Sequence, residues 1–160
     1  MNSEAYGTTL FCDDIRNENN GKLILVGCYT NEMNFSGPAP GMLPTFAALV
    51  NLRVPRDVEF SKIKLVVVKQ LTSEREEIFK TEIEVTKEQR EQAFSAVEHE
   101  KPEDQILAMT FPLSWTPLPI KEEGLIKVRA YLDDKIKLRL GALKINFPKA
   151  DIEAESAAQT

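Results

Sequence analysis

The stretch LIKVRAYLDDKIKLRLGALKINF, residues 125–147, alternates apolar and polar residues along two runs and predicts a β-hairpin. Every second residue of the first run is apolar, namely Ile126, Val128, Ala130 and Leu132. After the polar residues 133–135 the alternation resumes with Ile136, Leu138 and Leu140. A period of two is the spacing of a strand with one buried and one solvated face. The pattern predicts an all-β fold, an antiparallel β-sandwich of immunoglobulin-like or C2-like architecture.

The polar face of this hairpin is basic, although the chain has a formal net charge of -5. A three-residue loop keeps the apolar residues opposite one another and puts Arg129 opposite Arg139. Like charges directly opposite on a sheet are unfavourable. Either carboxylates of a neighbouring strand, such as Glu82 or Glu84, neutralise this face, or an acidic protein partner does. The candidate partner-binding residues are Lys127, Arg129, Lys137 and Arg139.

The second strand of the hairpin changes phase near its middle. Leu140 is apolar at an even position, whereas Leu143 and Ile145 are apolar at odd positions. One residue must be absorbed between them, and a glycine tolerates the backbone geometry this requires. We therefore predict a β-bulge at Gly141–Ala142.

Seven further stretches have strand-like patterns, so eight to nine strands are expected in all. They lie at about 8–15, 22–29, 32–36, 45–54, 61–71, 76–85 and 105–113. The run 22–29 is apolar on both faces, which predicts a central strand. Thr86 and Gln89 have the spacing of a capping box and predict one short helix near 87–97. Residues 1–150 are expected to form a single sandwich domain, followed by a frayed acidic tail at 151–160.

Composition argues against several classes of protein. With 42% hydrophobic and 28% charged residues, the chain resembles an ordinary globular protein rather than a disordered one. The negative net charge argues against nucleic-acid binding, and no apolar run approaches the roughly 18 residues that span a membrane. The first residues lack the pattern of a signal peptide. We expect a cytoplasmic protein without nucleic-acid or membrane partners.

Few residues of the chain offer catalytic or metal-binding chemistry. The only histidine, His99, follows a glutamate in a polar loop and is expected to be solvated. Cys12 and Cys28 lack a metal-site spacing and are expected to be buried thiols, near each other but not directly opposite. We predict no catalytic residue, no metal site and no cofactor.

Pairs of neighbouring carboxylates suggest two alternative functions for this protein. The pairs at 13–14 and 133–134 could belong to a β-sandwich that binds Ca²⁺ or a small ligand. Alternatively, Asp13, Asp14 and Arg16 could serve an enzyme of unfamiliar type. Asp14 and Arg16 could equally form a structural ion pair.

The opening segment LFCDDIR (residues 10–16), followed by NGKL (20–23) and VGCY (26–29), resembles the start of an uncharacterised family of small bacterial and phage proteins. The closing segments GLIKVR (124–129) and RLGAL (139–143) are similar to the end of the same family. The resemblance covers most of residues 6–147 and implies one β-rich domain in a bacterial or phage setting. It implies no activity and no site residue. The expected function is a non-catalytic protein-interaction module that binds a protein partner.

Overall fold

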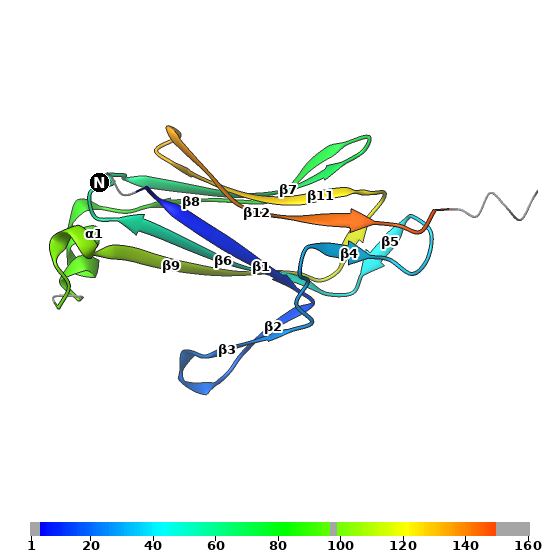
Figure 1. Cartoon of the computed structure of the whole chain (residues 1–160), viewed down its shortest axis with the longest axis horizontal. Coiled ribbons are helices and arrows are strands. Elements are labelled where there is room, and N and C mark those ends of the chain that lie inside the picture. Colours follow the sequence, from blue (N-terminus) through cyan, green and yellow to red (C-terminus); the bar gives the residue numbers. More distant parts are fainter. Residues whose placement is uncertain (1–3, 97–98, 150–160) are drawn as a thin grey trace, which may run out of the picture.

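Twelve strands, one α-helix and two short 3₁₀ turns form the described part of this computed structural model, residues 4–96 and 99–149 (Figure 1). The strands are β1 (Tyr6–Cys12), β2 (Asp14–Asn17), β3 (Leu23–Val26), β4 (Glu32–Asn34), β5 (Gly41–Leu43), β6 (Phe46–Pro55), β7 (Lys62–Leu71), β8 (Arg75–Glu84), β9 (Ile106–Trp115), β10 (Leu118–Ile120), β11 (Gly124–Leu132) and β12 (Ile136–Asn146). The helix is α1 (Lys87–Ser95), and the 3₁₀ turns are η1 (Asn19–Gly21) and η2 (Pro102–Asp104).

Two sheets face each other and form the sandwich (Figure 1). The larger sheet has the strand order β4-β12-β11-β7-β8, and the smaller has the order β1-β6-β9. Two more pairs, β5 with β10 and β2 with β3, are attached to this body. Among the described strands, every pair is antiparallel except β4 with β12. The predicted all-β sandwich with one short helix is confirmed, and the parallel pair is an exception to its antiparallel pattern.

The core lies between the sheets and follows the predicted alternation. Every second residue of β6, β7 and β11 points inward and is almost fully buried, including Phe46, Val50, Leu52, Val54, Ile63, Leu65, Val67, Ile126, Val128 and Ala130. The inward residues of β8 and β9 are partly buried. Removing apolar surface from water at roughly 25 cal/mol per Å² is the main force that holds two such sheets together. The long strands were therefore predictable from periodicity alone.

The chain has more strands than the sequence predicted. The stretch 8–15 is divided at Asp13, where the chain leaves the smaller sheet and enters the β2–β3 hairpin. Strands β5 and β10 have three residues each, and β10 contains Pro119, which cannot donate to a ladder. Short strands interrupted by proline carry no periodic signal.

The prediction that 22–29 forms a central strand is wrong. Strand β3 pairs with β2 alone among the described strands, and the hairpin projects from the smaller sheet (Figure 1). Ile24 and Val26 are 41% and 37% exposed. An apolar run fits a hairpin arm with one open face as well as a strand inside a sheet, and periodicity does not separate the two.

The closing hairpin has the predicted register. Leu132 faces Ile136 around the three-residue loop 133–135, and Arg129 faces Arg139. This register was predictable because apolar residues on one face can meet across the hairpin in only one way.

The predicted β-bulge is present, one position earlier than expected. The pairing passes from Val128–Gly141 directly to Arg129–Arg139, which leaves Leu140 as the extra residue. Gly141 has a φ of +150°, a conformation that side chains rarely adopt. The bulge restores the phase, so that residues 140, 143 and 145 all point into the core.

Helix α1 begins at the predicted capping box and lies at one end of the sandwich (Figure 1). The Thr86 hydroxyl accepts from Gln89 N at 3.1 Å, and Thr86 N donates to Gln89 Oε1 at 2.9 Å. The helix ends at Ser95, and residue 97, its predicted end, lies outside the described residues, as does the predicted tail at 151–160. No helix in the described ranges is long and apolar enough to cross a membrane.

Candidate functional site

The outer face of β11 and β12 carries several cations and no carboxylate. Its residues alternate with the core residues of the same strands and are Leu125, Lys127, Arg129, Tyr131, Lys137, Arg139, Ala142, Lys144 and Asn146. Lys144 approaches Glu32 of β4 at 3.5 Å. The other four cations, Lys127, Arg129, Lys137 and Arg139, are here called the basic strip. Lys137 and Arg139 are exposed, whereas Lys127 and Arg129 are half-buried.

Strand β7 separates the basic strip from the glutamates of β8. Val66 of β7 lies beside Arg129, and Lys64 lies between Tyr131 and Glu82. Within residues 4–96 and 99–149, no ion pair holds any residue of the basic strip. The glutamates that could have neutralised this face therefore lie two strands away from it.

The nearest lysines of β7 already have a carboxylate of their own. Asp134, in the loop of the closing hairpin, pairs with Lys62 at 2.9 Å and also with Lys64. These hydrogen bonds raise the pKa of both lysines and lower the pKa of Asp134 to about 2. This carboxylate of the hairpin loop is thus paired with β7 and not with the basic strip.

Arg129 is held in an unfavourable electrostatic setting. Its Nη1 donates to Val128 O at 2.8 Å and reaches Gly141 O, at the bulge, at 3.5 Å. Burial, and next the positive charge of Arg139, lower the pKa of Arg129 below its ordinary value. The two arginines repel each other, and an anion placed beside them would relieve that repulsion.

A groove of about 490 Å³ borders the basic strip, between the starts of β1 and β12. It is lined by Ala5, Tyr6, Gly7, Lys137, Leu138 and Arg139. A Cβ at Gly7 would lie 2.7 Å from Leu140 Cδ2, so the two strands approach closely here. Tyr6 is 54% exposed. Tyrosine and arginine are enriched in protein–protein interfaces.

Tyr6 was missed by the sequence prediction. Its strand reads as an ordinary alternating run, and nothing in that run indicates which strand of the other sheet lies beside it. The basic strip was found because all four of its residues belong to a single hairpin.

The carboxylates at the start of the chain do not converge on a common point. Asp14 Oδ2 lies 3.0 Å from Arg16 Nε, which is the structural ion pair considered from the sequence. Asp13 Oδ1 accepts a hydrogen bond of 2.5 Å from the Tyr29 hydroxyl. Each of the two aspartates therefore has its own partner.

The loop between β11 and β12, which carries residues 133–134, lies apart from the junction of β1 and β2, which carries residues 13–14 (Figure 1). Asp133 accepts from Ser61 N at 3.0 Å and from Lys62 N at 2.8 Å, and so ties the hairpin loop to the start of β7. Within the described ranges, no group of three or more His, Cys, Asp or Glu residues is arranged to hold a metal ion. A cation would have to displace existing partners at either pair.

The two cysteines differ in their surroundings. Cys12 is fully buried, as predicted, whereas Cys28 is exposed, so the prediction of two buried thiols is wrong for Cys28. Cys28 follows Gly27, whose φ of +65° turns the chain as it leaves the hairpin. His99 is exposed, as predicted.

Comparison with known proteins gives a family without an assigned activity. Among curated proteins, none matches this chain. The sequence model of a family of unknown function (DUF6941) matches residues 7–142, from the start of β1 into the last strand. The chain therefore belongs to the family of unknown function DUF6941.

Proposed function

We propose that this protein is a non-catalytic interaction module of a bacterial or phage cell, which binds an acidic protein partner in the cytoplasm through the basic strip. The observation that carries the proposal is that Arg129 faces Arg139, with no ion pair to either within the described residues. The bacterial or phage setting rests on the resemblance of residues 10–29 and 124–143.

Charge supports a partner with clustered carboxylates. Two guanidinium groups held opposite each other cost free energy in the isolated protein, and carboxylates placed between them would return that cost on binding. The chain has a net charge of -5, so its basic face would also orient an approaching acidic partner toward the basic strip. Complementary potentials of this kind raise association rates and exclude wrong partners.

Shape supports a protein partner rather than a small molecule. Small ligands bind in concave sites that bury most of their surface. Of the basic strip, only Lys137 and Arg139 line the groove beside Tyr6, whereas Lys127 and Arg129 lie with Tyr131 on the outer face of the sheet. An outer sheet face with aromatic groups next to arginines resembles the composition of protein interfaces.

The test compares three forms of the full chain as bait in extracts of the native host, with bound proteins identified by mass spectrometry. The forms are the wild type, Arg129→Gln/Arg139→Gln, and Lys22→Gln/Lys101→Gln. The last removes two exposed cations outside the strip and matches the change in net charge. We expect an acidic protein that the wild type and the control retain, that the strip variant loses, and that moderate salt releases.

Two results would contradict the proposal. The strip variant could retain the same protein as the wild type, or the control could lose it equally, which would indicate a general effect of net charge. Nuclease treatment of the extract tests whether a nucleic acid, and not a protein, binds the basic strip. If nuclease abolishes the capture, the basic strip binds a nucleic acid and the proposed protein partner is wrong.

A further inference from the structure

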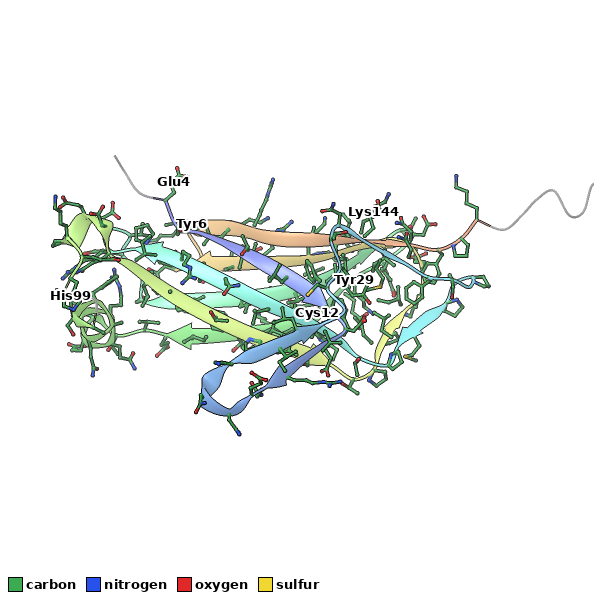
Figure 2. All side chains as sticks on the ribbon, turned by 60° about the horizontal axis from the view of Figure 1, so that its bottom comes forward. Glu4, Tyr6, Cys12, Tyr29, His99 and Lys144 are labelled. Atoms are coloured by element: carbon green, nitrogen blue, oxygen red, sulfur yellow. The ribbon has the colours of Figure 1, made fainter. Side chains whose placement is uncertain are left out.

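The two cysteines lie opposite each other where the β2–β3 hairpin leaves the sandwich. The backbone hydrogen bonds that flank them run from Asp13 N to Val26 O, at 2.9 Å, and to Gly27 O, at 3.2 Å, and from Tyr29 N to Phe11 O, at 2.8 Å. Counting one residue inward from the last two bonds places Cys12 directly across from Cys28. The expectation that the thiols are not directly opposite is therefore wrong. Figure 2 shows Cys12 and Tyr29 together at the root of the hairpin.

The spacing at this position suits a covalent link. None of the flanking hydrogen bonds joins the two cysteines themselves, so they lie between the hydrogen-bonded positions, next to the turn at Gly27. Opposite residues at such positions have Cα atoms about 4.5 Å apart. A disulfide needs a Cα separation of roughly 4.4–6.8 Å. The usual spacing of opposite residues is therefore compatible with a disulfide between Cys12 and Cys28.

The two thiols also have complementary environments. Cys28 is exposed and can meet a soluble oxidant. Cys12 is fully buried, and its Sγ donates to Asp14 O at 3.4 Å. Burial, and next the charge of Cys28, raise the pKa of Cys12 to about 11. Cys28 is the first thiol to react, and Cys12 is the resolving thiol.

We propose that Cys12 and Cys28 form a reversible disulfide that ties the root of the β2–β3 hairpin to the end of β1. The Cys28 thiolate attacks a low-molecular-weight disulfide, such as oxidised glutathione, and forms a mixed disulfide while one glutathione thiolate leaves. Cys12 then loses its proton and attacks the Cys28 sulfur, which releases the second glutathione thiolate. Two protein thiols are oxidised, one small disulfide is reduced to two thiols, and the two protons pass to the released thiolates.

The bond would act on the element that projects furthest from the smaller sheet. The hairpin presents Ile24 and Val26 to solvent, and its attachment to the sandwich runs through residues 12–14 and 26–29. A cross-link at this root restricts hinge motion of the hairpin. The oxidation state of the cysteine pair then sets how firmly the exposed apolar residues are held. This inference does not depend on the basic strip.

The test equilibrates the full chain in mixtures of oxidised and reduced glutathione, traps free thiols with an alkylating reagent under denaturing conditions, and measures the intact mass. In oxidising mixtures we expect the loss of two hydrogen atoms per chain, no alkylation, and a peptide that joins Cys12 to Cys28. Excess reduced glutathione should restore both thiols. Cys12→Ser should stop at the glutathione adduct of Cys28, and Cys28→Ser should remain unreacted while folded, because Cys12 is buried.

Three results would overturn the proposal. They are a wild-type chain that keeps a glutathione adduct on Cys28 with Cys12 free, a covalent dimer formed through Cys28, and two free thiols in the most oxidising mixture. Hydrogen exchange of the wild type gives a second readout that needs no variant. Amides of residues 14–26 should exchange more slowly after oxidation, and unchanged exchange would contradict a tie at the hairpin root.

Discussion

Gly141 occupies a backbone conformation that depends on the absence of a side chain. Its φ is +150°, and a Cβ there would lie 3.2 Å from Thr9 Cβ on the facing strand. We expect Gly141→Val to lower the free energy of unfolding by about 1–3 kcal/mol, measured by urea denaturation. Gly37→Ala is the control, since Gly37 has open space around it. That change should be neutral or stabilising by up to about 1 kcal/mol, and equal losses for the two variants would contradict the strained bulge.

Asp134 makes the stability of the fold depend on pH in the acid range. Hydrogen bonds from Lys64 and then Lys62 lower its pKa from the ordinary 3.8 to about 2. Because the folded-state pKa is the lower one, the stabilisation is fully present above 3.8 and is lost as the pH falls through about 2. Denaturation of the wild type and Asp134→Asn should show a difference at neutral pH that shrinks across this window. A difference that is independent of pH would contradict the ion pairs.

Sequence reasoning at the scale of residues succeeded where one hairpin holds both members of a contact. The positions of Arg129 and Arg139 follow from local alternation and loop length alone. The exposure of Cys28 and the place of Tyr6 beside Lys137 depend on chain segments far away in the sequence. No local pattern encodes such distant neighbours.

The capping box of α1 is an element whose contribution can be measured directly. The Thr86 hydroxyl satisfies the Gln89 N–H, which would otherwise lack a partner in the first turn. We expect Thr86→Ala to lower the free energy of unfolding by about 1 kcal/mol. Urea denaturation monitored by circular dichroism measures this change. Thr86→Ser keeps the hydroxyl and should lose much less. If serine and alanine destabilise equally, the cap does not contribute as described.

Elements with one dry and one wet face were predictable, and the others were not. The alternation of β6 and β11 reports the environment of each side chain directly. The run at β3 is apolar on both faces, and the fold uses it as a hairpin arm with Ile24 exposed. Hydrophobicity alone records a preference for burial, but not whether the fold satisfies that preference.

We expect the charges of the basic strip to contribute little to the stability of the fold. Arg129 and Arg139 repel each other, so Arg139→Gln should leave the free energy of unfolding unchanged or raise it by less than about 1 kcal/mol. Thermal denaturation at low ionic strength measures this change, because screening weakens the repulsion at high salt. A marked decrease in the free energy of unfolding would mean that Arg139 stabilises the folded protein, which would contradict a role of the strip in partner binding alone.

The central claim, that a protein partner binds the outer face of β11 and β12, is tested most directly by site-specific photo-crosslinking in the native host. Ala142 is exposed on that face and carries no charge, and Ala108 of β9 is its counterpart, exposed on the outer face of the smaller sheet. A photoreactive residue at position 142 should give a covalent adduct with an acidic protein. The adduct should be absent at position 108 and should disappear from position 142 in Arg129→Gln/Arg139→Gln. An adduct at 108 with none at 142, or an adduct at 142 that survives loss of both arginines, would contradict the account.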